Sequence, residues 1–359
     1  MQIHRFSPSR TQVAVLLACA LGAGSAAAAG TPVTLAIGTT SIDASQANNT
    51  SVPIYTKCWE KEGLDVTIQP INSTAAVQAV LSGQAHFANL GPGAALQARA
   101  KGAPIKAVYV NIRKNFQFPV VMEDSPIKSI KDFKGKTIGV ISYGAVLVQI
   151  IKAQIAEAGL DPEKDVSFIE TGTGAQAVAA LRSGRVDIWG TWDSQIATAE
   201  NMGVKLRKFT TPAGEKLDFG SSFFVRDDYI QSSPQVIEKL LRCLIQGTQV
   251  TMANPEGAIR AHWQVFPSSK PSNLDDETAM KQALHLVKTR MEYLKVDPGQ
   301  KYGEITLRSA TDMIDFMRRN NQLPGQLDPK DAFTAQFIDA ANRFDPAAVK
   351  AAADALPKK

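Results

Sequence analysis

The feature that most constrains the fold is a regular alternation, from residue 31 onward, between short runs rich in β-branched residues and amphipathic runs with helical periodicity. The short runs predict strands at 33–38, 64–71, 85–90, 105–112, 118–123, 136–142, 166–170, 186–190 and 222–228. From about residue 234 the pattern is mostly helical. Strands that alternate with helices of this length predict an α/β protein with parallel sheets and helices on both faces.

One arrangement occurs twice in the sequence. The segment LRSGRVDIWGTWD at 181–193 matches VLSGQAHFANLGP at 80–92, 101 residues earlier, when the two Ser-Gly pairs are aligned. Each copy indicates a helix, a glycine turn, a short buried strand, a polar loop and a second helix. We therefore expect two similar lobes, each with its own sheet. Because ligands of open α/β sheets bind beyond the carboxyl ends of the strands, the loops at 88–93 and 189–194 would line one cleft between facing lobes.

The first 29 residues predict a cleaved signal peptide at 1–29. Arg5 and Arg10 form a positive region, and the apolar run that begins at Val13 is too short to span a membrane and dissolves into small residues. We therefore expect an exported protein, periplasmic in a cell with two membranes. As an alternative, the LLAC sequence that ends at Cys19 resembles a lipoprotein acylation box, which would anchor the mature chain to a membrane.

The mature chain then has two cysteines, Cys58 and Cys243. A single pair in an exported protein can form a disulfide, but the sequence does not establish that the two residues lie close together. Both occur in segments with helical periodicity. We interpret each as a small, buried apolar residue.

Composition and motifs argue against nucleic-acid binding and against an enzyme. The net charge of +5 falls to +3 without the first 29 residues, and there are no long basic runs. Beyond the signal peptide the histidines are His86, His262 and His285, and their spacing is not that of a zinc site. A turn at 172–177 matches a dinucleotide fingerprint only locally. We predict no catalytic residue, no metal and no cofactor, and we interpret His86 as a satisfied core histidine.

Hydroxyl groups and glycine-rich turns lie at several predicted helix starts. Backbone N–H groups and hydroxyls at such positions can hold an anion without an arginine, although each alone is also a common helix cap. Aromatic residues of the same loops would contact the body of a ligand. The candidate ligand-binding residues are Thr39, Thr40, Ser41, Asn89, Gly91, Ser142, Tyr143, Gly144, Thr173, Gly174, Trp189, Trp192 and Asp193. Together they predict a small-molecule anionic ligand.

The most distinctive of these residues are Trp189, Trp192 and Asp193. Two residues three apart on a regular strand cannot point the same way, so we expect one tryptophan in the core and one in the cleft. Asp193 has three interpretations. It binds an amino group of the ligand, caps the following helix, or holds the cleft closed.

Three motifs resemble the substrate-binding proteins of ABC importers for sulfonates, taurine, nitrate and thiamine-precursor pyrimidines. They are VLSGQAHFANLGPGAALQARAKGAPIKAVYV at 80–110, DSPIKSIKDFKGKTIGV at 124–140 and ALRSGRVDIWGTWDSQIATAE at 180–200. The last one contains Asp187, Trp189, Trp192 and Asp193 in the pattern Asp-x-Trp-x-x-Trp-Asp. That pattern resembles the aliphatic-sulfonate branch in particular.

This resemblance implies a bilobal, type II periplasmic-binding-protein ("flytrap") fold with two hinge strands, which we place near 118–123 and 221–227. Lobe 1 would comprise 30–120 and 222–359, with the C-terminal helices packed back on it, and lobe 2 would comprise 121–221. The resemblance further implies a monomeric, non-catalytic protein. Such a protein closes on its ligand and presents it to an inner-membrane ABC permease.

The chain departs from the sulfonate pattern in ways that leave the ligand open. His86 stands where the family usually has aspartate, and Arg113 and Lys114 bring positive charge toward the cleft entrance. The ligand is then either an alkyl sulfonate or a bulkier, aromatic or aliphatic carboxylate. The alternative is pyrimidine-precursor binding, or a synthase-like enzyme on the same fold.

Overall fold

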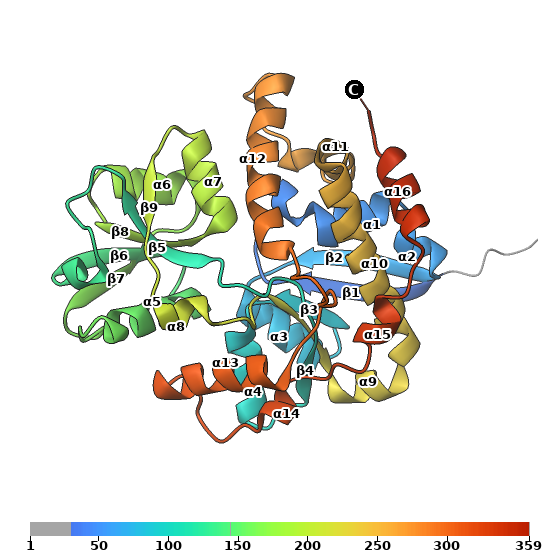
Figure 1. Ribbon diagram of the computed structural model, residues 1–359, viewed down its shortest axis with the longest axis horizontal. Coiled ribbons are helices and arrows are strands. Elements are labelled where there is room, and N and C mark those ends of the chain that lie inside the picture. The colour runs from blue at the N-terminus through green and yellow to red at the C-terminus, as the bar shows by residue number, and fades with distance from the viewer. Residues whose placement is uncertain (1–29, 144, 359) are drawn as a thin grey trace, which may run out of the picture.

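The computed structural model describes residues 30–143 and 145–358. The predicted signal peptide at 1–29, the alternative acylation site Cys19 and Gly144 lie outside the described residues. The described chain forms two separate five-stranded sheets, which Figure 1 shows in two lobes. The predicted α/β class is therefore confirmed.

The first sheet has the strand order β2-β1-β3-β10-β4. Its strands are β1 (Thr31–Ile37), β2 (Leu64–Pro70), β3 (Phe87–Leu90), β4 (Ile105–Val110) and β10 (Ser222–Arg226). Strand β1 pairs in parallel with β2 and β3, whereas β10 runs antiparallel between β3 and β4.

The second sheet repeats this layout in the order β7-β6-β8-β5-β9. Its strands are β5 (Gln117–Met122), β6 (Lys136–Val140), β7 (Val166–Glu170), β8 (Ile188–Trp192) and β9 (Leu206–Lys208). Strand β5 is antiparallel to β8 and β9. The expectation of parallel sheets is thus corrected to two mixed sheets, and the short edge strand β9 was not predicted because three residues show no periodicity.

Helices cover the sheets. They are α1 (Ser51–Tyr55), α2 (Cys58–Lys61), α3 (Ser73–Leu81), α4 (Pro92–Ala100), α5 (Val146–Glu157), α6 (Gly174–Arg182), α7 (Asp193–Asn201), α8 (Pro212–Glu215), α9 (Asp227–Ser232), α10 (Pro234–Ala253), α11 (Pro255–Val265), α12 (Asp276–Leu294), α13 (Leu307–Arg319), α14 (Pro329–Ala332), α15 (Ile338–Ala341) and α16 (Pro346–Asp354), with 3-10 turns η1 (Ala44–Asn49), η2 (Ile130–Phe133) and η3 (Pro267–Ser269). Over residues 30–143 and 145–358, every helix is too short or too polar to cross a membrane.

The internal repeat is a repeat of structure. Helices α3 and α6 begin and end 101 residues apart, and so do α4 and α7. Gly83, between α3 and α4, and Gly184, between α6 and α7, both have positive φ, at 78° and 71°. Glycine adopts this conformation without steric cost. The Ser-Gly turns therefore end equivalent helices and start equivalent strands.

His86 and Asp187 occupy equivalent places in this repeat and make equivalent bonds. The Thr34 amide donates to His86 Nδ1, and the Thr137 amide donates to Asp187 Oδ2, each at 2.9 Å. Burial, with a smaller effect of nearby Arg226, lowers the pKa of His86. A neutral ring keeps Nδ1 free to accept a hydrogen bond. A histidine thus fulfils the bonding role that an aspartate has in the other lobe. The interpretation of His86 as a satisfied core histidine is corrected in part, because its ring is hydrogen-bonded but the residue is only half-buried.

The chain passes from the first sheet to the second through 111–116 and returns through 209–221. These two crossing segments lie side by side, since the amides of Asn111 and Ile112 both donate to the Ser221 carbonyl, at 2.8 and 3.0 Å. A Cβ atom at Gly220 would lie 2.2 Å from the Ile112 carbonyl oxygen, so only glycine allows this approach. The predicted hinge segments, 118–123 and 221–227, fall mostly within β5 and β10. The lobe boundaries at 120/121 and 221/222 stay a prediction.

Helix α12, one of the C-terminal helices expected to pack back on lobe 1, contacts elements of both lobes. One of its sides packs in the first lobe, where Val287 joins a cluster with Ala44 and Ile259. Its other side faces α7 of the second sheet, and the Asn201 side chain donates to the Gln282 carbonyl at 3.0 Å. Figure 1 shows α12 standing between the two lobes, beside α7.

Cys58 and Cys243 form a disulfide, with their Cα atoms 5.7 Å apart. Our interpretation of both as free, buried apolar residues is therefore wrong. The bond joins α2 to α10 within the lobe that carries the first sheet, across a sequence separation of 185 residues that contains the whole second sheet. Sequence periodicity placed both residues on helices but could not place the helices against each other.

Removing this disulfide should lower stability. A loop of this length predicts about 5 kcal/mol from chain entropy, and natural disulfides typically contribute about 2–5 kcal/mol. We expect the double variant C58S/C243S to melt well below the wild type and to be insensitive to reductant, whereas wild-type protein should approach the variant when reduced. Equal melting of oxidised and reduced wild type would contradict this prediction.

His262 on α11 is fully buried and lies 2.9 Å from the Ser51 hydroxyl through Nδ1, while its Nε2 has no partner among the described residues. Burial lowers the pKa of His262 to about 4, partly offset by the charge of Asp43. The folded protein therefore resists protonation of a ring that the unfolded chain protonates near pH 6.5.

This histidine should make the protein acid-sensitive. As the pH falls below about 6.5, the unfolded chain binds a proton at this ring before the folded protein does. The free energy of unfolding therefore decreases between about pH 6.5 and pH 4, by roughly 3 kcal/mol in total. Denaturant titrations at several pH values should show a steeper loss over that interval for the wild type than for His262→Gln. The same dependence of unfolding free energy on pH in the wild type and in His262→Gln would contradict the prediction.

Candidate functional site

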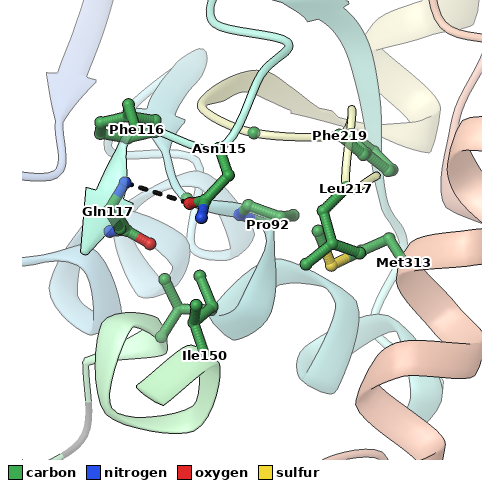
Figure 2. A pocket seen from close by; sticks show the side chains of 11 residues that line it. Pro92, Asn115, Phe116, Gln117, Ile150, Leu217, Phe219 and Met313 are labelled. Carbon is green, nitrogen blue, oxygen red and sulfur yellow. Dashed lines mark hydrogen bonds between the residues drawn. The ribbon is translucent and has the colours of Figure 1, made fainter. Parts of the chain in front are cut away.

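A small cavity lies between the two sheets, beside both crossing segments. It is lined by Gly91, Pro92, Asn115, Phe116, Gln117, Val146, Ile150, Leu217, Phe219, Gly220 and Met313. The lining thus comes from the start of α4, from both crossings, from α5 and from α13, so each lobe contributes one wall. Figure 2 shows these side chains converging from different elements.

The cavity is mostly apolar and small. No lining side chain among the described residues is charged, and the space that water centres can reach is about 20 Å³, enough for about one water. The lobes are in contact around it, since a Cβ atom added at Gly93 would lie 2.7 Å from Cγ2 of Val146. Glycines at the start of α4 therefore permit the close approach of α5.

One polar group of the lining has no partner. The Asn115 Oδ1 atom accepts a hydrogen bond from the Gln117 amide at 3.0 Å, which is the dashed line in Figure 2. The Nδ2 atom of Asn115 is buried and finds no partner among the described residues. An amide donor is thus held at the wall of an apolar cavity.

Of the predicted site residues that the structure describes, Gly91 alone is among those that line the cavity. Asn89 is buried, and its side chain accepts a hydrogen bond from the Asn49 side chain and donates one to the Ser221 hydroxyl, both at 3.2 Å. It therefore joins β3 to η1 and to the second crossing. Thr39, Thr40 and Ser41 follow β1, and the Thr39 hydroxyl donates to the Ser41 carbonyl.

The predicted residues of the second sheet are placed at the ends of β6 and β7. Ser142 is half-buried, and Tyr143 is 55% exposed, with its amide bonded to Glu170 and its hydroxyl to the Phe168 carbonyl. Thr173 precedes α6 without a capping bond from its side chain, and the Gly174 amide donates to Gln195 at 2.8 Å. None of these residues belongs to the described cavity lining.

The two tryptophans of the second repeat occupy different surroundings. Trp189 is 1% exposed and belongs to the core on one face of the second sheet. Trp192 is half-buried, donates from Nε1 to the Ser194 hydroxyl at 3.1 Å, and pairs in the sheet with Gln117 of the cavity. The backbone of Trp192 is therefore next to the site, although its side chain is not among the lining groups.

Asp193 forms a buried ion pair that the sequence did not reveal. It is 1% exposed, and its two carboxylate oxygens accept from Nε and Nη2 of Arg290 on α12, both at 2.6 Å. Asp193 is the first residue of α7 and makes no capping bond, so the capping interpretation is wrong. The Asp193 amide donates to the Phe116 carbonyl, and the Arg290 guanidinium lies 5.3 Å from the Phe116 ring centre.

The same seam between α7 and α12 carries a second polar contact. His285 on α12 bonds Asn201 through Nδ1 at 2.9 Å and lies 3.1 Å from Glu200 through Nε2.

Arg113, on the first crossing segment, is also engaged in ion pairs. It pairs with Asp218 of the second crossing at 3.2 Å and with Glu304 at 3.8 Å. The contacts of Arg113 thus join the two crossings to each other.

Comparison with known proteins agrees with this architecture. A provisionally named binding protein of Brucella abortus (strain 2308) is 28% identical over 286 residues, which cover 79% of this chain and 84% of the relative. The crystal structure of the periplasmic aliphatic sulphonate binding protein SsuA from Escherichia coli superposes with a TM-score of 0.65 at 17% identity, over 84% of this chain and 92% of that one. The likeness to this structure confirms the expected bilobal fold.

An enzyme shares the fold as well. The desulfurization enzyme DszB superposes with a TM-score of 0.55 at 13% identity, over 87% of this chain and 98% of that one. At such identity the likeness concerns the fold alone. A family model described as NMT1/THI5 like matches residues 58–258, more than half of the sequence. The chain therefore belongs to the NMT1/THI5-like family, with the two-lobed architecture of sulfonate-binding proteins.

Proposed function

We propose that this protein is an exported solute-binding protein that captures a small organic anion and delivers it to an ABC import permease. The ligand class is an alkyl sulfonate or an aromatic or aliphatic carboxylate. The observation that carries the proposal is the cavity to which both lobes and both crossing segments contribute. Such a site is formed only when the lobes meet, which is what a capture mechanism requires.

In this mechanism the ligand stabilises the closed arrangement because it contacts both lobes at once. Its anionic head would interact with hydroxyl and amide donors in the loops after β1, β6 and β7, where Thr39, Ser142 and Thr173 lie. Its apolar body would extend into the cavity. A ligand larger than one water needs the lobes to separate before it enters, and the paired crossings supply the hinge.

Periplasmic location and a signal peptide at 1–29 belong to this proposal. The disulfide between Cys58 and Cys243 suits an oxidising compartment. The sulphonate-binding structure of similar fold is that of a periplasmic protein. The protein would act as a monomer and present the closed form to its permease.

The second candidate is an enzyme on the same fold, or a protein that binds a pyrimidine precursor. The desulfurization enzyme shows that this architecture supports catalysis. The two functions differ in what happens to the ligand: a binding protein returns it unchanged. Product formation from a bound compound by protein that lacks residues 1–29 would favour the enzyme.

Ligand binding should raise the melting temperature and compact the protein. Purified protein without residues 1–29 is titrated with a panel of sulfonates, carboxylates and pyrimidines, and a true ligand at 100 times its Kd adds about 2.7 kcal/mol of stability. Small-angle scattering should show a smaller radius of gyration with the same compound, and native mass spectrometry should detect it intact. A complete panel without either effect would refute the binding function.

The buried pair of Asp193 and Arg290 should hold the lobes together. Asp193→Asn leaves the Arg290 charge buried without its partner, which typically costs about 3–5 kcal/mol. We expect a lower melting temperature and a larger radius of gyration without ligand. Asp312→Asn, which removes an exposed pair with Arg308 at 3.6 Å, is the control and should change neither.

A second variant distinguishes the effect of an unpaired buried charge from a general loss of folding stability. Because a buried ion pair can be replaced by apolar groups of similar size at little cost, the double variant D193L/R290M should recover much of the stability. Wild-type stability and scattering for Asp193→Asn would show that the pair has no part in closure.

A further inference from the structure

We propose that Asn115 selects the ligand, by donating a hydrogen bond from Nδ2 to an oxygen atom on the ligand's otherwise apolar body. The compound class is an aromatic carboxylate that carries a neutral acceptor, such as a ketone or ether oxygen, away from its charged head. This inference rests on the proposed function. It adds a chemical requirement for the end of the ligand opposite its charged head, which the loops that would hold the head do not contact.

The orientation of the Asn115 amide is determined by its neighbour. Because the Gln117 amide donates to one end of the side chain at 3.0 Å, that end must be the oxygen. The amide nitrogen is consequently the end that is left for the cavity. Figure 2 shows the Asn115 amide directed among Pro92, Gln117 and Ile150, toward the middle of the lining residues.

The surroundings of this nitrogen call for a single acceptor. A buried donor without a partner is unfavourable, so whatever fills the cavity is favoured if it offers an acceptor there. Around it the wall is apolar, with Ile150, Leu217, Phe219 and Met313. Besides Asn115, the Gln117 side chain is the other polar side chain among the described lining residues, so a ligand with several polar groups at this end would find few partners for them, whereas a pure hydrocarbon would leave Nδ2 without one.

The acceptor should be neutral rather than the charged head itself. The two guanidinium groups nearest this wall are both engaged, Arg113 with Asp218 and Arg290 with Asp193. A carboxylate or sulfonate placed in the cavity would therefore have an amide N–H but no uncompensated cation, and its desolvation would be costly. The charged head is better held at the loops, with the neutral oxygen at Asn115.

The test compares two benzoates of similar shape. 4-Acetylbenzoate has a carbonyl oxygen that 4-isopropylbenzoate replaces with a methyl group. Calorimetric titration of wild-type protein lacking residues 1–29 should give at least tenfold tighter binding of the acetyl compound, since one hydrogen bond to a buried donor contributes about 1.4 kcal/mol. Asn115→Leu should lose this preference or reverse it.

Two further variants exclude a purely structural role. Asn115→Asp keeps the oxygen that accepts from the Gln117 amide but removes the donor, so the preference between the benzoates should disappear while the fold is kept, as judged by circular dichroism. Lys216→Leu, a change at an exposed residue next to Leu217 of the lining, should retain the full preference. The readout is a ratio of two affinities in one protein, so a general loss of stability does not imitate it.

The outcomes distinguish this inference from the proposed function. Equal binding of the two benzoates by wild type, or an undiminished preference in Asn115→Asp, overturns the role of Asn115 alone. Binding of other panel compounds but of neither benzoate overturns the compound class and leaves the transport function standing. Absence of binding for the benzoates and for the whole panel overturns both.

Discussion

The whole structure depends on the exchange of two strands between the sheets. After β4 the chain leaves the first sheet and forms β5, which runs antiparallel to β8 in the second sheet. After β9 it returns and forms β10, which runs antiparallel to β3 and β4 in the first sheet. Neither sheet is complete without a strand that has just crossed from the other. The crossings are therefore fixed at both ends by sheet hydrogen bonds, and in the proposed mechanism the relative motion of the lobes would be concentrated in 111–116 and 209–221.

Groups at this junction act in opposite directions on closure. The buried pair of Asp193 and Arg290 favours contact between α7 and α12, and its disruption typically costs about 3–5 kcal/mol. Against it, Asn115 Nδ2 is buried at the cavity wall without a partner among the described residues, which is unfavourable unless a ligand supplies an acceptor. In the proposed capture mechanism, a ligand that bonds this group would add to the contacts that favour closure.

The sequence predicted the elements well and the contacts between them poorly. All nine strand segments expected from periodicity contain a strand, and the 101-residue repeat coincides with equivalent helices, because both signals are local. The disulfide, the Asp193 to Arg290 pair at a separation of 97 residues and the cavity wall from Leu217 to Gly220 are contacts between distant segments. No periodicity encodes such pairings. Arg290 in particular lies on a helix whose pattern indicates only an amphipathic surface.

The repeat also explains why the most distinctive residues were not the ones that form the cavity. Gly91 and Pro92 of the first copy occupy the places that Trp192 and Asp193 occupy in the second. The small residues of the first copy leave space, and they line the cavity. The large and charged residues of the second copy fill their space: Trp192 bonds locally to Ser194, and Asp193 joins α7 to α12 through Arg290. Tryptophan and aspartate are conspicuous in a sequence because their side chains need specific partners. Here those partners belong to the protein itself, so these residues indicate the elements that support the cavity, whereas the glycine indicates the cavity.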